Sequence, residues 1–250
     1  MWAARTRGEW LADALVFGVL LAWYFGARSL PEFVLPGPVA VFQRLMALFT
    51  DADFLFHTMA SAIRVVASVL IALVIGGALA LLHRAVPALD WVIRDGLQPF
   101  LSSFPSIGWA ILAAIWFPMG HFSIIFVQVA ILIPFSLINL AEGLRQIDRD
   151  MLEMARSFTR NAPRITFRIT LPLIMPYVMG ALRISYGIAW KISLVAELLG
   201  SSSGLGYLML RAQGSADMTT VMAASFAIVL MFILGEKLVL DPLGRKFALR

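Results

Sequence analysis

The sequence predicts an all-α integral membrane protein, and three observations support this fold class. Hydrophobic residues make up 60% of the 250-residue chain. Charged residues make up 14%, against about 25% in soluble proteins. Apolar runs long enough to cross a bilayer as a helix, about 20 residues, recur between short polar segments. We therefore expect one membrane domain over residues 1–250, with about six transmembrane helices.

The first expected span covers residues 10–27 and is the least apolar, because it contains Asp13. A signal peptide is the alternative, but the run ends in Trp23, Tyr24 and Phe25 and lacks a clean small-residue cleavage site. The other five expected spans cover residues 65–82, 97–117, 122–141, 171–199 and 219–235.

The orientation follows from the Lys and Arg residues in the connecting segments, which favour the cytoplasm. With the N-terminus inside, the inner segments hold 14 of the 20 basic residues and the outer segments hold 4. The inner set includes Arg5, Arg7, Arg94 and Arg250, whereas the outer set is Arg28, Arg44, Arg64 and Arg211. We expect both termini and the loop 145–172 to be cytoplasmic, in a multi-pass cell-membrane protein.

The loop 145–172 is the longest polar stretch and holds six arginines. Asp148 and Asp150 are candidate N-caps for a short helix over 151–158, and Asp150 with Glu153 has the spacing of a capping box. Pro163 prevents that helix from continuing.

This loop resembles the cytoplasmic loop of permease subunits of binding-protein-dependent ABC importers. The family pattern is E-A-A, three residues, G, nine residues, I-x-L-P, and the positions here are Glu153, Met154, Ala155, Thr159, Ile169, Leu171 and Pro172. Met154 and Thr159 depart from it. Thr159 stands where glycine turns the family's chain, and a β-branched residue adopts positive φ poorly. Asn161 tolerates that conformation better, so we expect the turn near Asn161.

Other segments are similar to the nitrate, sulfonate and taurine branch of this family. They are Leu35-Pro36-Gly37-Pro38, Ile115-Trp116-Phe117 with Gly120, Leu182-Arg183 through Ala189-Trp190, Val195-Ala196-Glu197, and the stretch Ser203 to Leu208. Pro118 stands where glycine is expected. The resemblance implies a type I importer permease fold and a homodimer. It also implies two ATPase subunits, a soluble binding protein, membrane lipid as surroundings, and import of a small anionic solute. Gly76, Gly77, Gly180 and Gly187 would permit close helix approach in the dimer, with packing inside one chain as the alternative.

The resemblance also implies an ATPase-coupling role for the loop helix. Glu153 and Arg156 would make charged contacts with the ATPase, and Met154, Ala155 and Phe158 apolar ones. The full expected coupling set is Asp150, Glu153, Met154, Ala155, Arg156, Phe158, Thr159 and Arg160. Alternatively, Glu153 only caps the helix and the arginines only follow the charge bias of inner loops.

The chain has no G-x-x-x-x-G-K-[ST] phosphate loop, so we expect ATP and Mg²⁺ to be bound by a partner and not here. There is no cysteine, and His57, His83 and His121 fall in three different connections, so we expect no metal site. No Ser/His/Asp group gathers on one side, so we expect no catalytic residues and no enzyme activity. The basic residues lie in short segments between apolar runs, so we expect no nucleic-acid partner. The alternative function is a stand-alone secondary transporter or channel. The carboxylates Asp13, Glu142, Glu197 and Glu236 lie near span ends, which disfavours ion coupling.

Arg183, Gly187 and Lys191 lie four residues apart in the fifth span and form one stripe that could line the substrate path. A charge in a membrane helix costs about 2.5–3.5 kcal/mol on insertion scales, so Lys191 should face water, a partner or an anionic substrate. Pairing with Glu197, or with a carboxylate on another helix, is the alternative.

Overall fold

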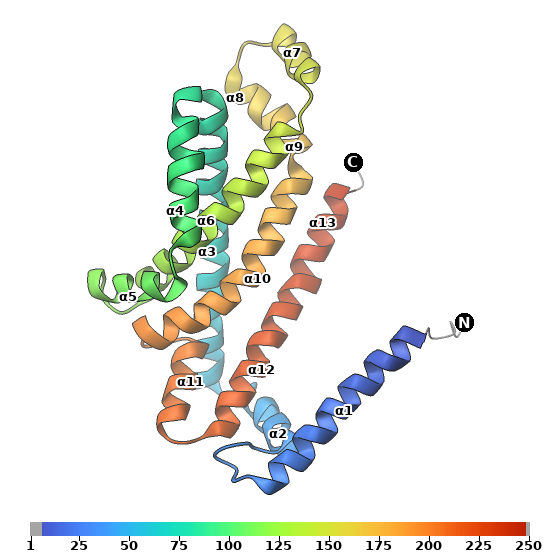
Figure 1. Ribbon diagram of the computed structural model, residues 1–250, viewed down its shortest axis with the longest axis vertical. Helices are drawn as coiled ribbons and strands as arrows, with labels where there is room; N and C mark the ends of the chain where they lie inside the picture. Colours follow the sequence, from blue (N-terminus) through green and yellow to red (C-terminus); the bar gives the residue numbers. More distant parts are fainter. Residues whose placement is uncertain (1–6, 249–250) are drawn as a thin grey trace. The chain divides into compact units, whose positions relative to one another are not determined.

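The computed structural model describes residues 7–248, and every regular element in that range is a helix (Figure 1). Within residues 7–248, four helices are long and apolar enough to cross a membrane, or five if one sharply bent pair is a single span. The prediction of an all-α membrane protein is therefore confirmed. Arg5 and Arg250, which contribute to the orientation count, lie outside the described residues.

The described chain forms two compact units. Unit 1 comprises the chain up to Phe56 together with Leu208–Ala227, and unit 2 comprises His57–Tyr207 and the chain from Ile228 onward. The long helices α3 (Ala52–Ala85) and α12 (Met218–Gly235) each pass from one unit into the other.

Unit 1 contains α1 (Arg7–Ser29), α2 (Pro38–Leu48), most of α11 (Leu205–Gly214) and parts of α3 and α12. Trp23 of α1 stacks on Phe226 of α12, and its indole Nε1 donates to the carbonyl of Pro36 at 3.0 Å. Pro38 begins α2. A proline is tolerated there because the N–H of the first helical residue has no hydrogen-bond partner within the helix. α1 is not among the four helices that qualify as spans, so the count of six transmembrane helices stays a prediction.

Unit 2 is built around α6 (His121–Arg145) and α10 (Met175–Gly200), which pack along each other. The chain approaches α6 through η1 (Pro87–Leu89), the π-helix η2 (Trp91–Leu97), α4 (Gln98–Ser103) and α5 (Ser106–Trp116). Between α6 and α10 come α7 (Arg149–Phe158), α8 (Ala162–Ile165), η3 (Thr166–Thr170) and α9 (Leu171–Leu173). The described chain ends with η4 (Glu236–Leu240) and α13 (Asp241–Ala248).

The predicted span 97–117 is not one straight helix. The chain bends by 86° between Pro87–Ser103 and Ser106–Trp116. Phe104 and Pro105 at the break are both extended, with ψ of 127° and 136°. The residue before a proline is biased away from helical geometry, which accounts for a break at this position.

The glycines expected at a dimer interface contact neighbours within this chain. A Cβ on Gly76 of α3 would lie 2.6 Å from Ser136 Cβ of α6, and one on Gly77 would lie 3.2 Å from Leu140 Cδ1. A Cβ on Gly180 would approach Asn139 at 3.8 Å, and one on Gly187 would approach Phe232 at 3.6 Å. Packing within one chain therefore accounts for Gly76 and Gly77, whereas a Cβ on Gly180 or Gly187 would make only ordinary van der Waals contacts.

Candidate functional site

The loop helix α7 begins two residues earlier than the sequence predicts. Asp148 is its N-cap, and its carboxylate accepts a hydrogen bond from the backbone N–H of Asp150 at 3.0 Å. The expected capping box between Asp150 and Glu153 is therefore wrong, because Asp150 is already inside the first helical turn. Glu153 is exposed on the described surface and does not act as the cap.

The chain leaves α7 without the positive φ that a glycine would supply. Thr159 is extended, with φ −157° and ψ 139°, and such geometry suits a β-branched residue. Asn161 has φ −76°, so the expected turn at Asn161 is also wrong. Its side chain instead accepts from the backbone N–H of Arg164 at 3.1 Å and caps α8. Pro163 lies in the first turn of α8, after α7 has ended.

The two faces of α7 differ sharply. Ala155 is 2% exposed, and Leu152 packs against the buried core formed by Ala80, Ile93, Leu137, Leu140, Leu144, Ile147 and Ile174. The adjoining side presents Met151, Met154 and Phe158, which are 44%, 57% and 85% exposed. The expected partner contact from Ala155 is therefore not available, because this side chain is covered by its own chain.

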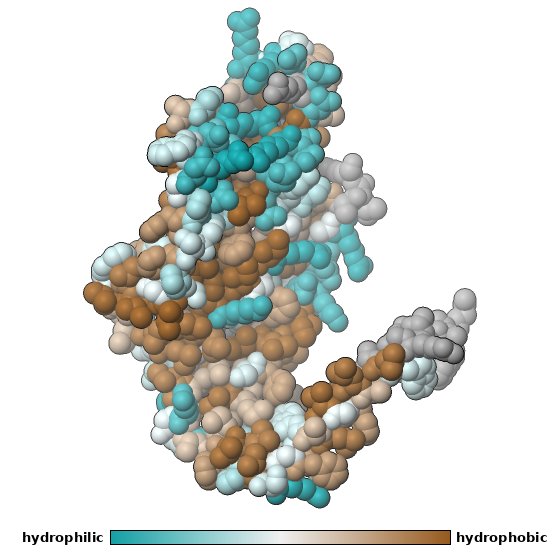
Figure 2. Space-filling model, in the orientation of Figure 1, coloured by the Kyte–Doolittle hydropathy of each residue, from teal (hydrophilic) through white to brown (hydrophobic). Residues whose placement is uncertain are grey.

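Charged side chains surround the exposed apolar residues of α7. Glu153, Arg156 and Arg160 are all exposed. Figure 2 shows hydrophilic residues gathered over the end of unit 2 that carries α7 and α8, next to a hydrophobic zone. Helix α7 is thus a polar helix with three large apolar side chains facing outward.

A second polar cluster lies inside unit 2, where sequence reasoning expected only isolated residues near span ends. Arg64 of α3 and Glu197 of α10 are 0% and 1% exposed, and Arg64 Nη1 lies 2.9 Å from Glu197 Oε1. Ser61 Oγ donates to the same carboxylate at 2.8 Å, and Ser193 Oγ does so at 3.2 Å. Arg64 Nε also donates to His121 Nδ1 at 3.1 Å.

This cluster holds the glycine-rich segment 201–206. Arg64 donates to the carbonyl of Ser203 at 2.8 Å, and the N–H of Gly206 donates to Glu197 Oε2 at 3.0 Å. The N–H of Gly204 donates to His57 Nδ1 at 3.0 Å. Arg64 and Glu197 are 133 residues apart, and no spacing pattern links them, so the sequence alone does not indicate their pairing.

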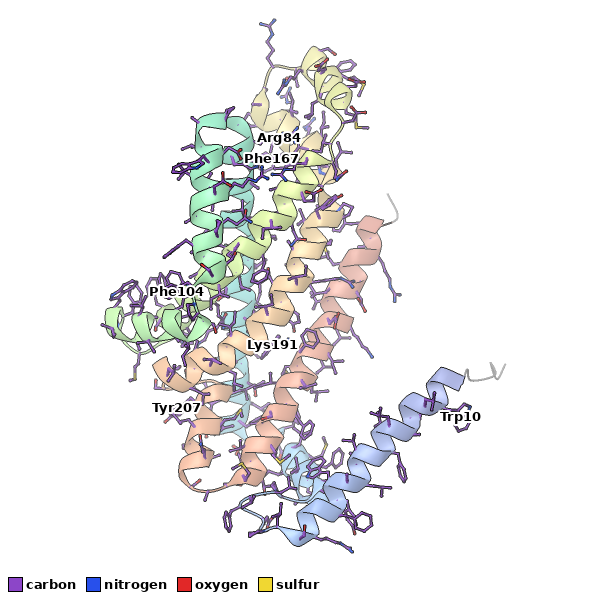
Figure 3. The ribbon with its side chains drawn as sticks, in the orientation of Figure 1. Trp10, Arg84, Phe104, Phe167, Lys191 and Tyr207 are labelled. Carbon is purple, nitrogen blue, oxygen red and sulfur yellow. The ribbon has the colours of Figure 1, made fainter. Side chains whose placement is uncertain are left out.

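The expected stripe on α10 is partly covered by the C-terminal helices of unit 2. Arg183 Nη2 lies 2.8 Å from Asp241 Oδ1 of α13, and Gly187 faces Phe232 of α12. Lys191, labelled on α10 in Figure 3, is exposed, and no hydrogen bond or ion pair is found for it among the described residues. Glu197 pairs with Arg64 and not with Lys191, so that expected alternative is wrong.

Comparison with known proteins identifies the family. Residues 87–239 match the family described as binding-protein-dependent transport system inner membrane component. A probable ABC transporter permease protein of Haemophilus influenzae is 31% identical, over 88% of this chain and 89% of the relative. The bicarbonate transport system permease protein CmpB of Synechococcus elongatus is 30% identical, over 83% and 78%. A putative aliphatic sulfonates transport permease protein of Bacillus subtilis is 27% identical, over 93% and 84%.

The chain belongs to the family of binding-protein-dependent transport system inner membrane components. It is an ABC transporter permease of the inner membrane and a component of a transport system, not an enzyme. The resemblance to the sulfonate branch of these permeases is thereby confirmed.

Proposed function

We propose that this chain is the transmembrane subunit of an ATP-driven importer and that α7 couples it to a separate ATPase, which binds ATP and Mg²⁺. A soluble binding protein delivers a small anionic solute on the opposite side of the membrane. The observation that carries this proposal is the outward apolar surface of α7, formed by Met151, Met154 and Phe158. Apolar groups rimmed by charges are typical of protein interaction sites.

The buried side of α7 explains how binding of the ATPase to this helix could affect the membrane-spanning helices. Leu152 packs on a core that contains Leu137 and Leu144 of α6, Ile174 next to α10, and Ala80 of α3. Close-packed interiors transmit displacement because they contain few voids. A movement imposed on α7 by a partner is therefore passed to three of the long helices of unit 2.

The docking surface can be tested by introducing a charge on it. Phe158→Asp should reduce the amount of ATPase subunit that copurifies with the chain, because burying an unpaired carboxylate is costly. Arg164→Asp, on exposed α8, is the matched control and should retain the ATPase. Full retention by Phe158→Asp would remove α7 from the interface.

An anionic solute is supported by two observations. Two relatives carry bicarbonate and aliphatic sulfonates in their names. Lys191 presents an exposed positive charge on α10, where a charge must face water, a partner or a substrate. The secondary-transporter alternative is less well supported, since the buried carboxylate of Glu197 is already paired with Arg64.

The orientation and copy number are part of the proposal. Both termini and α7 lie in the cytoplasm, and two permease copies form each transporter. Reporter fusions after Arg7 and after Arg145 test the orientation, and a periplasmic signal at either site would disprove it. Native mass spectrometry of the solubilised complex tests the copy number, which one permease per assembly would contradict.

A further inference from the structure

A basic cavity lies in unit 2 at the end that carries α7, and it has no role in the function proposed above. Its volume is about 230 Å³. It is lined by His83 of α3, Ile93 and Arg94 of η2, Gln98 of α4, and Leu137, Ile138, Glu142 and Arg145 of α6. Pockets for drug-sized ligands measure about 300–1,000 Å³, so this cavity suits a smaller group.

The two arginines of the cavity have spare hydrogen-bonding capacity. Arg94 makes no hydrogen bond or ion pair that is found among the described residues. Arg145 Nη1 lies 3.9 Å from Glu142 Oε2, and both side chains are 49% exposed, so this contact is weak. A guanidinium offers five N–H donors in a planar fork that matches the oxygens of an oxyanion.

The other polar residues of the cavity add hydrogen-bond donors and reduce its net positive charge. Gln98 has an amide N–H₂ that can donate, and His83 Nδ1 lies 2.6 Å from Asp90 Oδ1 without the alignment of a hydrogen bond. Glu142 accepts from Gln146 Nε2 at 2.9 Å and contributes the cavity's one carboxylate. The cavity therefore holds two permanent positive charges and one negative charge.

Arg94 lies in the π-helix Trp91–Leu97, one of three such segments in the described part of the chain. Single π-helical turns are frequently found at functional sites. Ile93 is 5% exposed and belongs to the core, and both Ile93 and Arg94 line the cavity.

We propose that this cavity binds a phosphate-type oxyanion between Arg94 and Arg145, either as a free ion or as the headgroup of an anionic lipid. Ile93 and Leu137 form part of the cavity wall and also part of the core on which Leu152 of α7 packs. An anion bound in the cavity therefore stabilises the core on which α7 packs. Through this core, the bound anion can affect coupling by α7.

The test measures the thermal stability of the full chain in an uncharged detergent. The probes are inorganic phosphate at constant ionic strength, and phosphatidylglycerol compared with phosphatidylcholine. Constant ionic strength is needed because salt alone screens surface charges. We expect phosphate or phosphatidylglycerol to raise the melting temperature of the wild type.

Arg94→Gln and Arg145→Gln should each raise the half-saturating probe concentration about tenfold or more, the loss expected for one charge-assisted hydrogen bond. Arg168→Gln, an exposed arginine outside the cavity, should respond like the wild type. Glu142→Gln removes the opposing charge and should lower the half-saturating concentration. If Arg94→Gln does not fold, Arg94→Lys can replace it, because lysine keeps the charge but lacks the planar guanidinium. Its half-saturating probe concentration should lie between that of the wild type and the value expected for Arg94→Gln.

A response to phosphate alone identifies a free oxyanion, and a response to phosphatidylglycerol alone identifies a lipid headgroup. Either result supports the proposed site if Arg94→Gln and Arg145→Gln both lose the response to that probe. Equal responses in the wild type, Arg94→Gln and Arg145→Gln would overturn the proposal, as would no response in the wild type to either probe.

Discussion

Arg64 and Glu197 form an ion pair that is shielded from solvent, with Nη1 and Oε1 2.9 Å apart and both side chains at most 1% exposed. Removing one partner leaves an uncompensated buried charge, which typically costs about 3–5 kcal/mol. We therefore expect Arg64→Met to lower the melting temperature of the solubilised chain strongly. The double variant Arg64→Met with Glu197→Leu should recover much of that loss, and a double variant as unstable as the single one would argue against the pairing.

Gly204 is expected to tolerate no side chain. Its φ is +109°, and a Cβ would lie 2.3 Å from Cδ of Glu197. Backbone strain of this kind costs about 1–3 kcal/mol, and the clash adds to it. Gly204→Ala should therefore destabilise the chain in a thermal melt. Gly214→Ala is the control, because nothing lies within 4 Å of its Cβ position, and equal melting of the two variants would contradict the geometry.

Two neighbouring glycines of α3 should respond differently to alanine. A Cβ on Gly76 would lie 2.8 Å from the backbone nitrogen of Leu137, which cannot move aside easily. A Cβ on Gly77 would lie 3.2 Å from Cδ1 of Leu140, the flexible end of a side chain. Overpacking costs about 1–3 kcal/mol, so Gly76→Ala should melt well below Gly77→Ala. The opposite order would show that α3 and α6 are not this close.

The all-α membrane class and the loop helix could be predicted from the sequence because they depend on local composition. Apolar runs mark long helices, and aspartates ahead of an amphipathic turn mark a helix start. The choice between Asp148 and Asp150 as cap could not be predicted, since both have the required side chain. The bend at Phe104 and Pro105 was missed because membrane helices often tolerate proline.

The pairing of Arg64 with Glu197 could not be predicted at all, because it joins residues 133 apart without a motif. Sequence reasoning placed both residues near span ends and offered Lys191 as an alternative partner for Glu197. Similarly, the packing of Leu152 on the core around Leu137 joins distant segments, and only the packed structure defines it. Long-range packing, not local pattern, decides these features.

Lys191→Met should reduce uptake of the solute by about tenfold if its charge faces an anion in the path, since charged hydrogen bonds contribute about 1.5–3 kcal/mol. The measurement is solute uptake by the reconstituted transporter with its wild-type binding protein. Lys191→Arg keeps the charge and should retain most of the uptake. Unchanged uptake by Lys191→Met would remove Lys191 from the substrate path.

The coupling role of α7 is tested by reversing the charge of one exposed residue. Glu153 is not the N-cap of α7, because Asp148 occupies that position, so Glu153→Arg should leave the fold intact. Asp148→Ala is the matched structural control and should cost about 0.5–2 kcal/mol of helix stability.

The deciding measurement is solute uptake and ATP hydrolysis by the same proteoliposomes containing the permease, its ATPase and the binding protein. With Glu153→Arg, we expect uptake per ATP hydrolysed to fall about tenfold, in the range of typical coupling energies between sites, while the melting temperature stays that of the wild type. Unchanged uptake per ATP, or a loss explained entirely by a lower melting temperature, would contradict coupling through α7.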